Sequence, residues 1–173
     1  MKLRHLPLML AITAGLASTA AQAATTGRLT FNGLVTAGTC NLAAGDVNRT
    51  ITLPTVKVSD FDNSNTAGLV QFELTADCES DIRFVNFLFT GPSSVGNATL
   101  FANTGSSGGT ALSLSHRNVA YIPANGTVAE RTRTIPTTAG KAVLPMNANY
   151  HKTGLALSAG NLASAVTVSI SYN

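Results

Sequence analysis

The sequence lacks the residue groupings on which most catalytic, metal and nucleic-acid sites are built. Histidine occurs only three times, and no histidine stands in a ligand-spaced cluster with acids or cysteines. There is no G-x-S-x-G nucleophile elbow, no phosphate-binding glycine loop, no CxxC pair and no basic run interleaved with aromatics. The sequence therefore predicts neither an enzyme nor a metal, cofactor or nucleic-acid partner.

The remaining polar candidates have simpler interpretations. His116 and His151 are predicted to be surface or strand-end histidines. The paired carboxylates Glu79 and Asp81 flank Cys78 and the start of a strand, where we expect a solvated turn.

The sequence also lacks an apolar run long enough for a membrane helix, which needs about 20 residues. The run from Leu6 to about Ala17 is shorter, follows Lys2 and Arg4, and is followed by Ala21-Gln22-Ala23. A short apolar stretch between basic residues and a small-residue cleavage site is typical of a secretory signal. We expect residues 1–23 to be removed and the mature chain not to enter a membrane.

Charge is scarce as well, at 11% of the chain. Without Lys2 and Arg4 the 11 basic residues fall to nine, against eight acidic ones. This near balance gives no argument for nucleic acid. The remaining 150 residues suit one domain, rich in the small and hydroxylated residues of exported β-proteins.

Only two cysteines are present, Cys40 and Cys78, and both remain after cleavage. In an oxidising compartment a disulfide between them is the default. A redox or metal site is the alternative, but it lacks a CxxC pair or nearby histidines.

Alternating apolar residues predict strands, and no helical period is sustained beyond a turn or two. Ile51 and Leu53 alternate with threonines, and Val56 and Val58 continue the pattern after a bend at Pro54. The most apolar run, 82–89, should be a centrally buried strand. Further strands are expected at 69–78, 111–115, 118–122 and 143–150. Many short strands separated by Gly, Pro and Asn favour an all-β sandwich.

The two ends of the mature chain carry the most informative strands. Gly27–Val35 alternates small or apolar residues with polar ones, although it lies near the expected mature N-terminus. Ala165–Asn173 alternates in the same way, so the chain ends inside a strand. We interpret the pair as a domain that takes a missing strand from a neighbour and offers its own. The alternative is an ordinary first strand in a self-contained monomer.

Several motifs in order resemble a structural pilin of the chaperone–usher family, close to the major subunits of type 1 and P fimbriae. The sequence G-x-(apolar)-T-F-N-G at 27–33 precedes the first cysteine, and Thr50–Leu53 is followed by Val56. The similarity continues through 72–78, through 144–150 followed by Gly154, and to a C-terminus with Gly160 upstream and a penultimate Tyr172.

The resemblance implies an incomplete immunoglobulin-like sandwich that lacks its last strand. It divides the chain into a signal peptide (1–23), a donor-strand extension (24–36) and a pilin domain (37–173). A periplasmic chaperone would fill the open groove until, at the outer-membrane usher, the extension of another identical or related subunit replaces it. The product would be a fimbria on the surface of a Gram-negative bacterium, used in cell adhesion.

The resemblance also implies roles for individual residues. The pocket-filling residues of the donor strand would be Thr25, Gly27, Leu29, Phe31 and Gly33. The strand that pairs with the chaperone, and later borders the acceptor groove, would contain Val166, Val168, Ile170, Tyr172 and Asn173.

Four other functions are alternatives to a structural pilin. A minor adaptor of the same fimbria shares these features, whereas a tip adhesin would need a further lectin domain and no donor extension. A self-contained secreted sandwich would be a binding protein. A copper–zinc dismutase-like enzyme would require a histidine cluster, which the sequence does not contain.

Overall fold

The structure is a computed structural model that describes residues 28–173, in two units that divide after Val35. The expected signal peptide (1–23) and the donor residues Thr25 and Gly27 lie outside the described residues. Within 28–173 no helix is long and apolar enough to cross a membrane.

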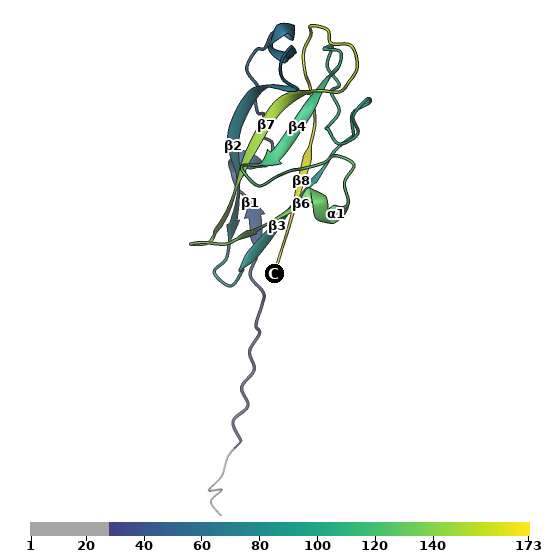
Figure 1. The fold of residues 1–173 in the computed structure, drawn as a ribbon. Helices are drawn as coiled ribbons and strands as arrows, with labels where there is room; N and C mark the ends of the chain where they lie inside the picture. Colours follow the sequence, from purple (N-terminus) through teal and green to yellow (C-terminus); the bar gives the residue numbers. More distant parts are fainter. Residues whose placement is uncertain (1–27) are drawn as a thin grey trace, which may run out of the picture. The chain divides into compact units, whose positions relative to one another are not determined.

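Eight strands form two antiparallel sheets in the second unit, Thr36–Asn173 (Figure 1). Along the five-stranded sheet the order is β1 (Cys40–Leu42), β2 (Thr66–Cys78), β7 (Lys141–Lys152), β4 (Thr110–His116) and β5 (Ala120–Tyr121). The three-stranded sheet contains β6 (Thr132–Pro136), β3 (Phe84–Thr90) and β8 (Thr167–Tyr172). Three single turns of helix complete the described elements: η1 (Ala44–Asp46), η2 (Val58–Phe61) and α1 (Val128–Arg131).

The core lies between the two sheets and follows the alternation of the strands. The buried side chains of the larger sheet include Leu74 and Ala76 on β2 and the even-numbered residues 142–148 on β7. On β3, Val85, Phe87 and Phe89 are at most 1% exposed. The expected all-β sandwich is confirmed, as are the strands expected at 69–78, 111–115 and 143–150 and the central place of β3 in its sheet. Of the strand expected at 118–122 only Ala120–Tyr121 forms, because residues 117–119 make a turn in which Asn118 has a positive φ of 59°.

The strand expected over Ile51–Val58 is not formed. Ile51, Leu53 and Val56 are half-buried while their neighbours are exposed, so the alternation correctly marks one inward face. No strand is paired with this stretch, and Val58 begins η2 instead. The helical turn forms because the Asp60 carboxylate accepts the Lys57 amide at 2.9 Å, as in a capping box.

The two long sides of the sandwich differ. On one side β1 and β8 come close to each other at the ends of their sheets but do not pair. On the other side Arg133 of β6 donates through Nη2 to the Tyr121 carbonyl of β5 at 2.5 Å, which links the edges of the two sheets. A side chain therefore connects the sheet edges at β5 and β6, whereas the edges at β1 and β8 are not paired with each other in the described structure.

Candidate functional site

The terminal strand β8 is an edge strand whose outer side pairs with no strand among the described residues. Asn173 bonds toward β3 through both its amide and its carbonyl oxygen, so by alternation the even-numbered residues of β8 direct their backbone groups toward the open edge. Val168 and Ile170 are among these residues, and their side chains pack on the core. The same residues thus direct their side chains into the core and their backbone groups toward the open edge of the sheet.

The five residues predicted for this strand share this region but differ in burial. Val166 immediately precedes β8 and packs on the core with Val168 and Ile170. Tyr172 is 38% exposed, and Asn173 is exposed just past the end of the strand.

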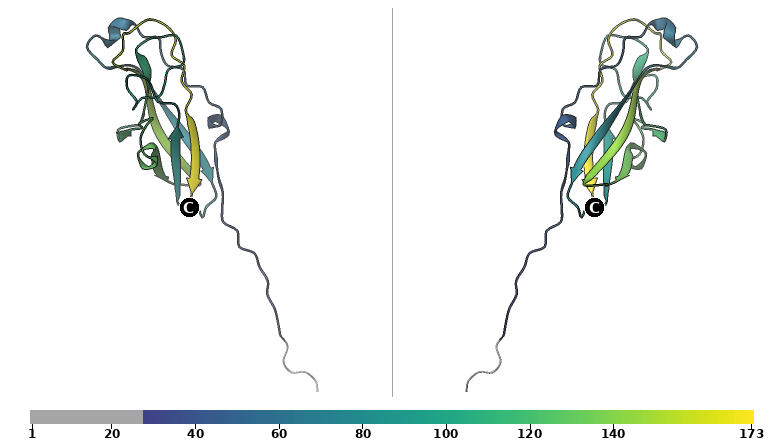
Figure 2. Two further views of the ribbon diagram at one scale, coloured as in Figure 1. Left: turned by 90° about the vertical axis from the view of Figure 1, so that its right-hand side faces the viewer. Right: turned by 90° about the vertical axis from the view of Figure 1, so that its left-hand side faces the viewer.

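A second unpaired stretch, residues 50–56, runs along the same side of the sandwich. Both views in Figure 2 show this part of the chain beside the yellow β8. Within the described part of the chain, the backbone groups of 50–56 make no hydrogen bond to other backbone groups. Leu53 nevertheless packs against the core.

The core is incompletely covered between these two stretches. Partly buried apolar side chains from both stretches and from the neighbouring strands pack on the core there; they are Leu42, Leu53, Phe72, Val166, Val168 and Ile170. We call this region, β8 together with residues 50–56, the acceptor side. It combines apolar surface with two unpaired backbone edges, which is the chemistry that a further β-strand would satisfy.

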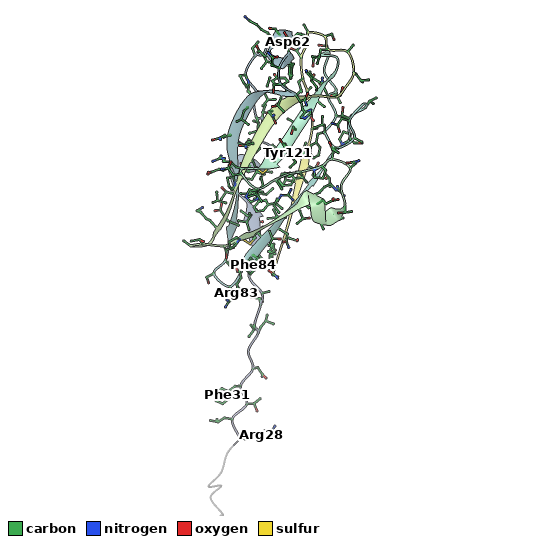
Figure 3. All side chains as sticks on the ribbon, in the orientation of Figure 1. Arg28, Phe31, Asp62, Arg83, Phe84 and Tyr121 are labelled. Carbon is green, nitrogen blue, oxygen red and sulfur yellow. A yellow bond between two sulfur atoms is a disulfide. The ribbon has the colours of Figure 1, made fainter. Side chains whose placement is uncertain are left out.

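The extension carries the complementary pattern. In the first unit, residues 28–35 form no helix or strand. Leu29 is 81% and Phe31 87% exposed (Figure 3), and Gly33 is exposed between them and Val35. Of the strand expected at Gly27–Val35, the described residues 28–35 are thus not paired as a strand within the single chain.

The disulfide expected between Cys40 and Cys78 is present. These two residues are directly opposite each other on β1 and β2, with their Cα atoms 4.1 Å apart. The bond therefore fixes the first strand of the sandwich to the second.

Glu79 and Asp81 do more than the solvated turn that we expected from the sequence. The Asp81 carboxylate accepts the Gly38 amide at 2.8 Å, and the Glu79 carboxylate accepts the Thr39 amide at 3.3 Å. A Cβ on Gly38 would lie 1.9 Å from an Asp81 carboxylate oxygen, so a larger residue there would require this carboxylate to move. The two acids hold the first residues of the sandwich in place. Sequence spacing gave no signal for this, because the partners are about 40 residues apart.

His116 and His151 both lie at or near the end of a strand, as expected. Within residues 28–173 no group of three or more His, Cys, Asp and Glu side chains is placed to hold a metal ion. His116 ends β4, where burial and the nearby positive charge of Arg133 lower its pKa. His151 lies near the end of β7, with Nδ1 2.6 Å from the Lys152 carbonyl.

Comparison with known proteins gives consistent matches. The family model described as "Fimbrial protein" matches residues 29–173. The chain is 30% identical to the F17 fimbrial protein of Escherichia coli over 170 residues, which cover 90% of this chain and 92% of that protein. It is 40% identical to the minor fimbrial subunit HifD of Haemophilus influenzae over 86 residues, or 47% of this chain and 39% of HifD.

Solved structures share the fold at lower identity. The crystal structure of the P pilus rod subunit PapA matches with a TM-score of 0.65 and 16% identity, covering 78% of this chain and 99% of PapA. A chaperone–usher pilus structure matches with a TM-score of 0.63 and 19% identity, covering 86% of this chain and 96% of that one. The immunoglobulin-like sandwich expected from the sequence is confirmed by these likenesses.

Proposed function

Because this chain belongs to the fimbrial protein family, we propose that its extension and its acceptor side are the two halves of a joint between successive subunits. The protein is a structural subunit of a chaperone–usher fimbria on the surface of a Gram-negative bacterium, and it assembles with other subunits into a fibre. It is not an enzyme, since the family is structural.

The proposal rests on one observation: the exposed apolar residues of the extension complement the partly covered core and the unpaired backbone groups of the acceptor side. Leu29 and Phe31 of the extension are exposed at alternate positions. The acceptor side offers partly covered core and two unpaired edges. A strand inserted there would bond to β8 and to residues 50–56, and its alternate side chains would complete the core.

The magnitudes favour a long-lived joint. Burying Leu29 and Phe31 contributes roughly 1.5–3 kcal/mol each. Each new backbone hydrogen bond adds about 0.5–1.5 kcal/mol net. The inserted segment is assigned as 24–36, with Thr25, Gly27, Leu29, Phe31 and Gly33 facing the core of the neighbour. Gly27 and Gly33 allow close approach where a larger side chain would not fit.

The same exposed surface explains why partners are needed before assembly. An unpaired edge beside apolar surface invites aggregation. We assign the covering role to a periplasmic chaperone that pairs with Val166, Val168, Ile170 and Tyr172 and anchors the carboxylate of Asn173. Removal of residues 1–23 would accompany export to the periplasm, and an outer-membrane usher would be the place where the extension replaces the chaperone.

A minor adaptor subunit is the second candidate, because the chain matches part of a minor fimbrial subunit at 40% identity. An adaptor would use the same joint but would occur at few positions in each fibre. Immunogold labelling of a tagged full-length copy separates the two roles, since a rod subunit labels the whole shaft.

The proposed joint predicts a ladder of multimers on an unboiled denaturing gel that collapses to monomer on heating. Phe31→Arg should abolish the addition of this subunit to others, because a charge would enter an apolar site. The chaperone-bound form should survive, since the acceptor side is unchanged.

Asn32→Arg is the matched control, because the same charge is placed on the polar face of the extension. It should retain the ladder. A wild-type monomer that is stable without any chaperone, or an undiminished ladder in Phe31→Arg, would contradict the proposed joint.

A further inference from the structure

Asp46 and Arg49 occupy the free edge of β2 just before residues 50–56 begin. β1 pairs only with the end of β2, from Ala76 to Cys78, so the β2 edge beyond it has no strand partner. Asp46 Oδ2 accepts the Thr75 amide at 2.8 Å, and Arg49 Nη1 donates to the Glu73 carbonyl at 2.7 Å. Two side chains thus take the place of a neighbouring strand.

The two side chains also hold each other. Arg49 Nη1 lies 2.9 Å from Asp46 Oδ1, and only 8% of the Asp46 side chain is exposed, against 38% for Arg49. The Arg49 guanidinium lies 5.7 Å from the centre of the Phe72 ring, within the range of a cation–π interaction. The bond from the Thr75 amide to Asp46 is partly buried and is therefore screened less by salt than the two exposed bonds of Arg49. We call this pair the Asp46–Arg49 clamp.

The far end of the 50–56 stretch is held separately. The Lys57 amide bonds to the Asp60 carboxylate, and Phe61 of η2 is only 2% exposed. Between the clamp and η2 the side chains of Ile51, Leu53 and Val56 are half-buried, while no backbone group in the described structure bonds to the backbone of 50–56. The stretch is therefore anchored at its two ends and unpaired along its length.

We propose that Asp46 and Arg49 are positioning residues for strand addition. They fix the start of 50–56 against β2, so that the backbone groups of this stretch lie where an inserted strand can bond to them while it also bonds to β8. This inference rests on the proposed joint between subunits and adds to it the residues that prepare its second edge.

Loss of the clamp would weaken the joint in a specific way. Without it, the seven residues from 50 to 56 must be ordered when the strand arrives, and that ordering opposes binding. The bonds to β8 would remain, because β8 is paired with β3 and does not depend on the clamp. The inserted strand should then be held along one edge and released faster.

The test uses the mature Phe31→Arg chain as an acceptor that cannot donate, refolded with a fluorescent synthetic peptide of residues 24–36. Release of the labelled peptide into excess unlabelled peptide is followed by anisotropy. Arg49→Ala should release it about tenfold faster, which corresponds to about 1.4 kcal/mol. Asp46→Asn should also speed release, and Arg49→Lys should fall between Arg49→Ala and the parent acceptor. Lys141→Ala, which removes the exposed basic partner of Asp77 at the start of β7, is the matched control and should leave release unchanged.

Hydrogen exchange separates positioning from a general loss of stability. In the parent acceptor the peptide should protect the amides of both 50–56 and β8. In Arg49→Ala it should protect β8 as before and leave 50–56 exchanging. General destabilisation would instead reduce protection throughout β2, β7 and β8.

The outcomes distinguish this inference from the proposed joint. If the parent acceptor takes up no peptide, the joint itself is wrong. If the parent binds but Arg49→Lys and Asp46→Asn both release peptide at the parent rate with full protection of 50–56, the clamp has no positioning role. The second result overturns the inference even where Arg49→Ala fails to fold.

Discussion

Arg133 and His116 place two basic groups near each other at the bridged side of the sandwich. Arg133 is opposite Phe87 on β3 and so points inward, where an apolar residue would be expected. Its guanidinium donates to the carbonyls of Tyr121, Glu130 and Thr132, while its Nε has no partner in the described structure. Burial lowers the pKa of Arg133. His116 has its pKa lowered first by burial and then by this positive charge.

This arrangement predicts that stability falls in mild acid. In the folded state the pKa of His116 is below its ordinary 6.5. As the pH falls below 6.5, the unfolded chain therefore binds a proton at this residue before the folded chain does, and this difference favours unfolding. The free energy of unfolding should therefore decrease as the pH drops below 6.5, and this contribution should level off once the pH passes the folded pKa. Urea unfolding of the peptide-filled acceptor, measured from pH 7.5 to 5.5, is the test.

His116→Asn should flatten this decrease, because it removes the titrating group. Most carboxylates titrate near pH 4, below the window, and so contribute little to the slope. An identical slope in His116→Asn and the parent would show that the decrease has another source.

At the scale of the element, the start of the sandwich depends on bonds between residues far apart in the sequence. β1 has only three residues, and it is held by the disulfide to Cys78 and, just before it, by Gly38 and Thr39 bonding to Asp81 and Glu79. So short a strand gains little from its own ladder. The covalent bond therefore carries much of the stability of this end.

Cys40→Ser should lower the amount of chaperone-bound subunit recovered from the periplasm. Closing a loop between residues 38 apart stabilises the fold by about 3–4 kcal/mol in the chain-entropy account, and Cys40 is only 5% exposed. Thr39→Ser, a conservative change at the exposed neighbouring position, is the control. The amount of chaperone-bound subunit is measured by immunoblot of the periplasmic fraction. An undiminished amount in Cys40→Ser would show that the disulfide does not have this role.

The elements also show what alternation in the sequence can predict. On β2 the inward residues share the parity of Cys78 and were assigned correctly, because a two-residue period reports which face is buried. Residues 50–56 have the same period but no paired neighbour, and periodicity does not report pairing.

β6 was missed because the inward Arg133 breaks its apolar pattern. Thr127 and Glu130, which form a capping box, were the available signal for α1.

For the candidate site, the sequence shows the alternating apolar faces of the extension and of β8, but it does not show the side-chain contacts that hold the neighbouring segments in place. The alternation in the extension and in β8 was visible because each strand presents one apolar face. The Asp46–Arg49 clamp bonds to Thr75 and Glu73, 29 and 24 positions away, and the Gly38–Asp81 bond joins residues 43 positions apart. No local pattern encodes such contacts, since they depend on how the sheets are placed.

For the whole molecule, the contrast between the two long sides implies one acceptor per copy. Arg133 bridges the sheet edges at β5 and β6, whereas the outer edge of β8 and the backbone of residues 50–56 have no strand partner among the described residues. Each copy also has one extension. In the proposed joint the donor and the acceptor are different surfaces, so copies would join head to tail, which is the kind of contact that builds a fibre.

This polarity predicts where a copy without an extension can stand in a fibre. A copy that lacks residues 24–35 and keeps residues 1–23 for export would accept a strand but have none to give, so it could occupy only the terminal position at which no donor is required. With an epitope tag in the exposed loop at Val95, it should appear by immunogold labelling at one end of a fibre, at most once. A full-length copy with the same tag should label along the shaft, because it has both halves of the joint. Truncated copies found along the shaft would mean that subunits join without the extension, and the head-to-tail joint would then be wrong.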